Sequence, residues 1–314
     1  MSVRGTRFEV GGAPFHFVGA NVAVMHGPVH RAHMEETLDA VASDGLSVVR
    51  LWALGEYDDG APDWADEYAF RRGPERWLEP ALAHLDRTLE ACRARGLRAI
   101  VVLGNRWPDY GGLGAYLRWA LVPFAPAADG SVPTTALTGF YESRAARDLY
   151  RAHVARVVGR TSALTGVAYH DDPTILAWEL VNELEAPRRD AGTLVRWVEA
   201  EAAYVRSLDP RHLVSAGHVG YVGLSDRRTW REVAGARGID YADAHAYPTR
   251  FGEVTDLAEL ARYVDDRAQL AHHVLDRPLV FGEVGFSTER PRVHGVARRR
   301  WLDAFLRAAA RDGV

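Results

Sequence analysis

One stretch decides the fold of this chain, the run Asp171-Asp172-Pro173-Thr174-Ile175-Leu176-Ala177-Trp178-Glu179-Leu180-Val181-Asn182-Glu183. Its apolar centre is typical of a strand, and the strand delivers an Asn-Glu pair at its C-terminal end. A carboxylic acid beside an amide, placed where a strand runs into a loop, suits acid/base catalysis. If Glu183 is one member of an acid/base and nucleophile pair, a second carboxylate should follow at the end of a later strand.

Strand and helix signals alternate on both sides of this stretch. A hairpin is predicted first, from Thr6–Val10 through a turn at Gly11-Gly12 into Phe15–Ala20. The predicted strands are Phe15–Gly19, Ser47–Leu51, Leu97–Leu103, Ile175–Val181, Leu213–Ala216, Tyr241–Ala244 and Leu279–Gly282. The predicted amphipathic helices are Met34–Ala42, Glu79–Arg95, Ser143–Thr161, Thr193–Ser207, Leu257–His272 and Val293–Ala310. This alternation, without a break in composition, predicts one parallel-stranded catalytic domain over residues 1–314.

Polar and aromatic residues follow nearly every predicted strand. They are Asn21, Arg50, Trp52, Asn105, Trp107, Asn182, Glu183, His245, Tyr247 and Glu283. Functional residues at the C-terminal ends of many different strands are typical of a (β/α)8 barrel. An open doubly wound sheet would gather its site at one switch point, usually with a glycine fingerprint after the first strand, and the sequence has none there. We therefore predict an α/β protein with a (β/α)8 (TIM) barrel.

The number of predicted units falls short of eight. Seven are visible, and the last helix runs into Arg311-Asp312-Gly313-Val314, where an eighth strand would be expected to begin. Either the barrel continues beyond this sequence, or it is left open beside its first strand. We favour the first reading, in which the eighth strand is missing and the domain is incomplete at its C-terminus.

Composition excludes several classes of function. No apolar run reaches the roughly eighteen residues of a membrane span. The net charge of -4 gives no reason to expect nucleic acid or an anionic membrane as a partner. All 38 basic residues are Arg, which excludes a Schiff-base lysine and a Walker-type phosphate loop. The single Cys92 rules out an internal disulfide.

The first residues carry no signal for secretion. Met1 to Gly12 are polar and Gly-rich and lack an apolar segment, so no signal peptide is predicted. As written, the sequence indicates a cytoplasmic protein, whereas a trimmed N-terminus would leave an extracellular one looking the same. We expect a monomer.

The second carboxylate required by Glu183 is Glu283. The segment Leu279–Phe286 is a short apolar strand that ends in this carboxylate between two glycines. The separation of 283 - 183 = 100 residues fits three βα repeats of a barrel that uses about 250 residues for eight units. Strands four and seven lie on opposite sides of a barrel mouth, so the two glutamates can face each other across a glycosidic bond.

Six segments carry a family resemblance in the order that the family has them. They are Phe17–Asn21, Val49–Trp52, Asn105–Gly112, Thr165–Glu183, His245–Pro248 and Phe281–Glu283. Through these segments the chain resembles the family 5 glycoside hydrolases, which are (β/α)8 barrels, and among them the endo-β-1,4-mannanases. The paired glutamates with Arg50, His245 and Tyr247 are shared by many related barrels. The stretches Trp107–Gly112 and Thr165–Leu180 point to mannanases in particular.

The resemblance implies a retaining mechanism with Glu183 as acid/base and Glu283 as nucleophile, and no metal or organic cofactor. Retention requires carboxyl groups about 5–5.5 Å apart. Glu183 is then expected to hold a proton at the working pH, and Glu283 to stay ionised. The resemblance places Arg50 beside Glu283 as a cation, with Tyr247 as a further hydrogen-bond donor.

The same resemblance assigns substrate-binding roles to other residues. Asn182 is expected to bind the 2-hydroxyl of the sugar at the cleavage point, and His245 to orient the acid/base or contact the substrate. We expect Trp107, in a Gly-rich loop, to stack on a sugar ring, and we include Asn105 and Trp52 as further substrate contacts.

Three positions qualify this picture. Strand alternation places Glu179 on the same face as Glu183 but deeper in the barrel, where we expect it to pair with an Arg. Arg106 stands where mannanases more often have Asn, and Leu184 where Pro is usual. These two departures leave the subsite preference open.

The sequence therefore predicts a glycoside hydrolase acting on β-mannan or a related polysaccharide or oligosaccharide. Two alternatives use the same catalytic groups. One is a hydrolase of β-glucan, and the other is an exo-acting hydrolase of short mannosides. A third alternative, from another class, is a carbohydrate-binding barrel without catalysis.

Overall fold

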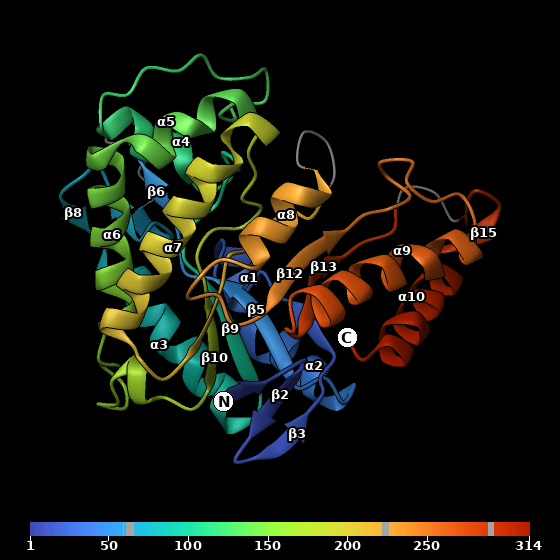
Figure 1. The fold of residues 1–314 in the computed structure, drawn as a ribbon. Coiled ribbons are helices and arrows are strands. Elements are labelled where there is room, and N and C mark those ends of the chain that lie inside the picture. The colour runs from blue at the N-terminus through green and yellow to red at the C-terminus, as the bar shows by residue number, and fades with distance from the viewer. Residues whose placement is uncertain (59, 61–65, 222–225, 288–291) are drawn as a thin grey trace.

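The structure is a computed structural model that describes residues 1–314 except 59, 61–65, 222–225 and 288–291. Parallel strands run through its centre and helices cover them (Figure 1). Seven of the described strands form this centre. They are β4 (Gly19–Asn21), β5 (Val48–Trp52), β9 (Arg98–Val102), β10 (Ile175–Glu179), β11 (Leu213–Ser215), β12 (Ala242–Ala246) and β13 (Leu279–Val284).

The seven strands follow the chain order in space. Five of them form one parallel sheet in the order β11-β10-β9-β5-β4, and β12 pairs in parallel with β13. The backbone N–H of Asp240, just before β12, donates to the Val214 carbonyl of β11 at 2.9 Å. On the other side, Nδ2 of Asn21 at the end of β4 donates to the Gly282 carbonyl of β13 at 2.8 Å. These contacts join the two-stranded sheet to both edges of the five-stranded sheet, so the seven strands surround a common centre.

Helices connect the strands much as the periodicity predicts. The long ones are α2 (Met34–Ser43), α3 (Glu79–Ala94), α6 (Arg144–Val158), α7 (Ala191–Leu208), α9 (Leu257–Gln269) and α10 (Arg298–Asp312). Shorter helices are α1 (Pro28–Ala32), α4 (Gly112–Trp119), α5 (Leu137–Glu142) and α8 (Arg227–Ala234), with single turns at Thr134–Ala136, Tyr169–Asp171, Arg188–Asp190 and Leu270–Val274. Ser143 caps α6, since its Oγ accepts from the Ala146 N–H at 3.2 Å.

Small antiparallel or mixed sheets occupy the ends of the structure. They are built from β1 (Ser2–Arg4), β2 (Arg7–Val10) and β3 (Ala13–Phe15); from β6 (Glu56–Tyr57), β7 (Arg71–Arg72) and β8 (Arg76–Trp77); and from β14 (Arg292–Val293) and β15 (Val296–Ala297). The first of them contains the predicted hairpin. Among the described residues, no helix is both long and apolar enough to cross a membrane.

Two predicted boundaries were wrong. The first barrel strand begins at Gly19, not at Phe15, because Ala13–Phe15 pairs with β2 in the hairpin instead. The last helix begins at Arg298 rather than Val293, because His294 and Gly295 take left-handed backbone angles (φ 47° and 74°) and turn β14 into β15. An eighth strand beyond Val314 stays a prediction.

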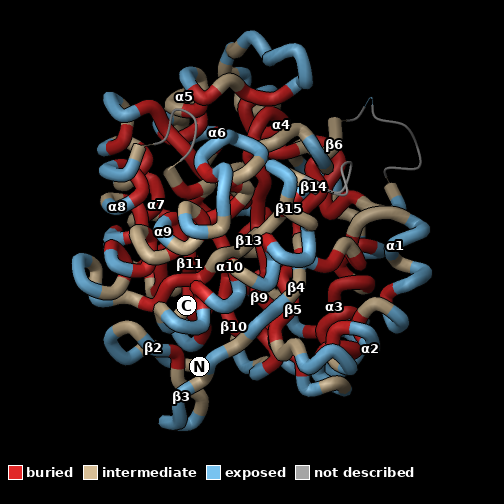
Figure 2. Tube along the Cα trace, turned by 90° about the vertical axis from the view of Figure 1, so that its right-hand side faces the viewer, coloured by how far each residue is buried: buried red, intermediate tan, exposed pale blue. Residues whose placement is uncertain are grey.

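Buried residues gather in the interior of the molecule, and exposed ones lie mainly on the outer loops and helices (Figure 2). Between strands and helices the largest cluster includes Leu51, Val101 and Trp178, and two smaller clusters pack the helices α8, α9 and α10 against β12 and β13. At the N-terminal ends of the strands another cluster closes the centre. Phe8 from the hairpin packs there edge-on against Tyr241, with the two ring centroids 5.4 Å apart. Apolar packing therefore fills the N-terminal end, and polar residues are left for the opposite end.

Candidate active site

The two predicted glutamates lie together at the C-terminal ends of the strands. Glu283 is the fifth residue of β13, and Glu183 comes four residues after the end of β10. One ligand atom each of Glu183, His245 and Glu283 can be chosen so that all three lie within 4.8 Å of one another. The Glu183 and Glu283 side chains are 13 % and 15 % exposed, so both reach the surface of a largely buried site.

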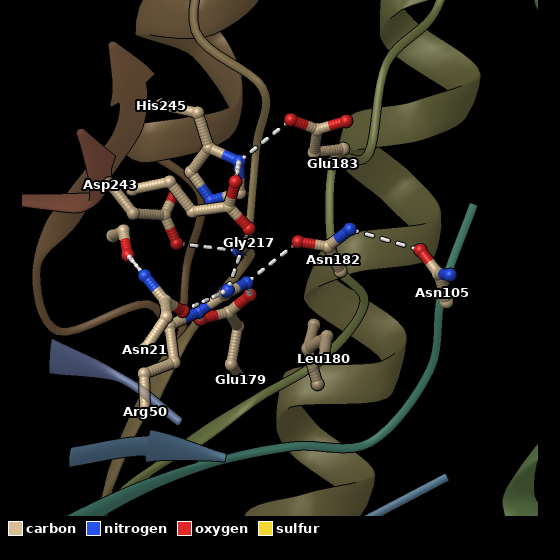
Figure 3. A network of polar contacts seen from close by, with 12 residues as sticks. Asn21, Arg50, Asn105, Glu179, Leu180, Asn182, Glu183, Gly217, Asp243 and His245 are labelled. Carbon is tan, nitrogen blue, oxygen red and sulfur yellow. Dashed lines mark hydrogen bonds and ion pairs between the residues drawn. The ribbon is translucent and has the colours of Figure 1, made fainter. Parts of the chain in front are cut away.

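Arg50 is the centre of the polar network beneath the glutamates (Figure 3). Its guanidinium binds Glu179 through two hydrogen bonds, from Nε at 2.8 Å and from Nη2 at 2.5 Å. The remaining three N–H groups donate to Glu283 at 2.9 Å, Asn21 at 2.9 Å and Asn182 at 2.8 Å. All five donors of the guanidinium are thus used. The predicted pairing of Glu179 with an Arg below the site is confirmed.

Glu283 is held by two donors on different strands. Nη1 of Arg50 donates to Oε1, and the hydroxyl of Tyr247, just after β12, donates to Oε2. Both are groups that stabilise a carboxylate in its charged form. The structure therefore brings Arg50 and Tyr247 to Glu283 as the family resemblance implies.

Glu183 is held by two other donors and has an unusual backbone. Nδ1 of His245 on β12 contacts Oε1 at 2.9 Å, and the indole N–H of Trp107 donates to Oε2. The backbone of Glu183 is left-handed, with φ at 61°. For a residue other than Gly or Asn this backbone conformation costs free energy, and such strained residues are concentrated at functional sites. Strand alternation could not have predicted this turn.

The electrostatics of the pair His245 and Glu183 differ from expectation. Burial raises the pKa of Glu183, but the hydrogen bond and charge of His245, the Trp107 donor and the charge of Arg50 leave this pKa below its ordinary value. Burial lowers the pKa of His245, but Glu283 and Glu183 outweigh it and raise this pKa above its ordinary value. Both directions favour an ionised Glu183 beside a protonated His245, whereas the resemblance implies a protonated Glu183.

The predicted residues Asn105 and Asn182 differ in what their side chains can still contact. Asn105 is completely buried, and its Oδ1 accepts from Asn182 at 2.9 Å and from the Trp107 backbone N–H at 3.2 Å. The geometry therefore favours a structural role for Asn105 over a substrate contact, because its polar atoms hold the loop after β9. Asn182 is 2 % exposed, with its Oδ1 on Arg50 and one N–H on Asn105. Its second N–H is available for the predicted 2-hydroxyl contact.

The two tryptophans have neighbours that the sequence did not indicate. The guanidinium of Arg106 lies 3.9 Å from the ring centroid of Trp107 and covers one face. A sugar could stack only on the other face, so that role stays a prediction. Trp52, at the end of β5, packs edge-on against His26 at 5.2 Å and Tyr110 at 6.1 Å, and its substrate contact also stays a prediction.

One cluster of the site also has the spacing of metal ligands. In the part of the chain that the structure describes, the group with metal-ligand spacing is Glu183, His245 and Glu283. Each of these is already held by protein hydrogen bonds, with Arg50 and Tyr247 on Glu283 and with His245 on Glu183. Hydrogen bonds within the protein therefore account for the positions of all three side chains.

Sequence reasoning gave no role to three participants. Asn21 links Arg50 to β13 through its side chain, and its only signal was its place at the end of a predicted strand. Arg106 covers one face of Trp107, and its guanidinium pairs with Glu185 at 2.7 Å. Arg106 was visible only as a departure from the family pattern, and Glu185 gave no signal.

Comparisons with known proteins agree on one family. Residues 1–309 match the family described as GH family 5 beta-mannosidase-like. A putative mannan endo-1,4-beta-mannosidase 5 of Oryza sativa subsp. japonica is 33 % identical, and the alignment covers 98 % of this chain and 65 % of the rice protein. Mannan endo-1,4-beta-mannosidase 5 of Solanum lycopersicum is 30 % identical, with 100 % of this chain and 78 % of the tomato protein covered. The chain thus spans about two thirds to four fifths of these relatives.

Solved structures show the same fold. The endo-1,4-beta-mannanase of Rhizomucor miehei superposes with a TM-score of 0.82 at 22 % identity, covering 100 % of this chain and 88 % of that one. The endo-1,4-beta-D-mannanase of Thermotoga petrophila superposes with a TM-score of 0.79 at 24 % identity, covering 95 % and 86 %. These similarities confirm the predicted (β/α)8 barrel class.

Proposed function

The chain belongs to the beta-mannosidase-like group of glycoside hydrolase family 5, and from this membership we propose that it is a retaining hydrolase of β-1,4-mannosidic linkages in mannan-type polysaccharides. The observation that carries the proposal is the spacing of the two carboxylates, whose oxygen atoms approach within 4.8 Å. Retaining enzymes keep their carboxyl groups about 5–5.5 Å apart, whereas inverting enzymes leave about 6.5–9.5 Å for a water molecule.

In the first step Glu283 is the nucleophile. Its carboxylate attacks the anomeric carbon and forms a glycosyl ester as the glycosidic C–O bond breaks, while Glu183 gives a proton to the leaving oxygen. Arg50 and Tyr247 hold the Glu283 carboxylate in its charged form and fix its direction. Glu183 must carry a proton when the substrate is bound, and His245, whose Nδ1 lies 2.9 Å from Oε1 of Glu183, is the group placed to supply it.

In the second step Glu183 acts as a base. It takes a proton from a water molecule as that water attacks the anomeric carbon, and Glu283 leaves as a carboxylate. The proton returns to the Glu183–His245 pair, so the site is restored. Asn182 can donate its second N–H to the 2-hydroxyl of the bound sugar, where the contact strengthens in the transition state.

The mannan relatives support the substrate class. The rice and tomato relatives are named as a putative mannan endo-1,4-beta-mannosidase and a mannan endo-1,4-beta-mannosidase, and the stretch Trp107–Gly112 at the site is one of the two that the resemblance linked to mannanases. We propose β-mannan, or a related oligosaccharide, as the substrate, with endo action.

A reducing-sugar assay on mannan, glucomannan, carboxymethyl cellulose and nitrophenyl β-mannoside tests this proposal. Mannan and glucomannan are expected to be cleaved, with a rapid fall in viscosity that marks endo action. Glu283→Gln should lose activity on the order of 10⁴-fold or more, because the nucleophile acts as part of one unit. Glu90→Gln, on α3 and paired with Arg93 at 2.6 Å, is the control that should keep full activity.

Other outcomes would overturn parts of the proposal. Preference for carboxymethyl cellulose would assign the same catalytic groups to β-glucan, and release of mannose without a fall in viscosity would assign exo action. Binding of mannan without any product over long incubation would indicate a carbohydrate-binding barrel.

A further inference from the structure

Arg106, in the loop after β9, is buried without being fully satisfied. Its side chain is 6 % exposed and pairs with Glu185 at 2.7 Å. Nη2 also donates to Oγ1 of Thr134 at 3.0 Å, and that hydroxyl in turn donates to Glu185 at 2.6 Å. Nε and Nη1 have no hydrogen-bond partner among the residues that the structure describes. Burying a cation in this way is costly, so its placement needs a further reason.

The reason lies on the other side of the guanidinium. Its central carbon is 3.9 Å from the ring centroid of Trp107, which is a cation–π contact. The indole N–H of the same ring donates to Oε2 of Glu183. A continuous chain of contacts therefore runs from Glu185 through Arg106 and Trp107 to the carboxylate proposed as acid/base.

We propose that Arg106 is a positioning residue for Glu183, which holds the Trp107 ring so that its N–H stays on the carboxylate, and that Arg106 and Glu185 together set how readily Glu183 takes and gives a proton. The inference rests on the proposed function, since it concerns the acid/base step of that reaction. Arg106 itself is buried behind the ring and touches no reacting atom in this arrangement.

Simple electrostatics gives the direction of the effect. A cation over the indole face draws electron density from the ring and makes its N–H a stronger donor. A stronger donor to a carboxylate favours the charged form, so Arg106 helps to keep the pKa of Glu183 low. Glu185 opposes this, because its negative charge lies 2.7 Å from the guanidinium and partly cancels it.

Other charged groups face the two ends of this chain of contacts. Glu183 is also faced by His245 and Tyr247 from the β12 end, Glu283 from β13 and Arg50 from β5. Arg106 is also near Asp129 and Tyr141. A substitution at Arg106 or Glu185 alters none of these groups. Differences between the pH profiles of such variants therefore report the change of charge behind Trp107.

The test compares Arg106→Met with Glu185→Gln in pH profiles of kcat/KM on mannohexaose. The alkaline limb reports loss of the proton that the acid must deliver. Without the cation, Arg106→Met should shift this limb to higher pH. With an uncancelled cation, Glu185→Gln should shift it to lower pH. If Arg106 and Glu185 had only a structural role, the alkaline limbs of the two variants would shift in the same direction or would not shift. Either result would overturn the proposal.

A second readout separates proton transfer from general damage. Arg106→Met is expected to lower kcat/KM for mannohexaose about tenfold and for dinitrophenyl β-mannoside less than about twofold, because that leaving group needs little protonation. Equal losses on both substrates would contradict the inference. Arg106→Lys, which keeps the charge and loses the planar stack, should show less than half of the alkaline shift of Arg106→Met.

The dependence on Trp107 completes the test. In a Trp107→Phe background, which lacks the indole N–H, adding Arg106→Met should change kcat/KM by less than about twofold, because coupled residues are not additive. A full tenfold loss in that background would place the effect of Arg106 elsewhere. If the unaltered protein cleaves neither substrate, the proposed function fails; if it cleaves both and the variants show no shift, only this inference fails.

Discussion

At the scale of single residues, Arg50 organises the site. Its five N–H groups are divided among two carboxylates and two amides, which come from three strands or their ends, β4, β10 and β13. The family resemblance predicted Arg50 beside Glu283, and strand alternation, which places Glu179 below Glu183 on one face, predicted a deeper Arg partner for Glu179. Neither predicted the amide contacts of Asn21 and Asn182, because these depend on how loop ends turn after their strands.

Replacing Arg50 by Met should destabilise the protein strongly. Glu179, which is 4 % exposed, would lose its buried partner, and breaking a buried pair costs about 3–5 kcal/mol. Urea unfolding measures the change. The double variant Arg50→Met with Glu179→Gln should recover part of the loss, and no recovery would contradict this account. Arg93→Met, at the exposed pair with Glu90, is the control with little expected change.

The Glu183–His245 pair predicts how stability depends on pH. Because the pKa of Glu183 is lowered from 4.5, its contribution is present above that value and is lost as the pH falls through the folded-state pKa. Because the pKa of His245 is raised from 6.5, its contribution is present below that value and is lost as the pH rises through the folded-state pKa.

The stability difference between the unaltered protein and His245→Asn should therefore be largest between these two ordinary pKa values and shrink on both sides. Urea unfolding at pH values from about 4 to 8 measures the difference across the titration range of Glu and His. A difference that stays constant, or one that is largest at the alkaline end, would rule out the charged pair.

At the scale of elements, prediction succeeded where apolar periodicity is strong and failed in the loops. The helices α2, α3, α6 and α7 end within three residues of their predicted limits. The loop after β9 is different, because its path depends on close backbone contacts. Its Gly112 has a left-handed backbone (φ 63°), and a Cβ there would lie 1.8 Å from the Trp107 carbonyl oxygen. Such contacts leave no periodic signal.

Gly112→Ala should therefore displace Trp107 from Glu183. We expect kcat/KM on mannohexaose to fall about tenfold or more, since small misplacements of catalytic groups are costly. Gly45→Ala is a matched control, because Gly45 is also left-handed (φ 76°) but has no atom within 4 Å of an added Cβ. It should lower stability by about 1 kcal/mol and leave kcat/KM unchanged. Equal activity losses in the two variants would contradict the role of the loop.

At the scale of the whole molecule, the barrel brings residues that are far apart in sequence into one site. Asn21, Arg50, Asn182, Tyr247 and Glu283 come from the ends of five strands, and Phe8 helps to close the opposite end. The sequence could predict this end of the barrel, because polar residues followed nearly every strand. It could not predict which face of each side chain meets the substrate, because that depends on packing between loops.

The central claim is a retaining reaction by Glu183 and Glu283, and the most direct measurement is the anomeric configuration of the first product. Proton NMR spectra recorded during the first minutes of mannohexaose hydrolysis should show the β-anomer of the new reducing end before mutarotation, because two displacements retain configuration. Initial release of the α-anomer would indicate a single displacement by water and would contradict the account of this site.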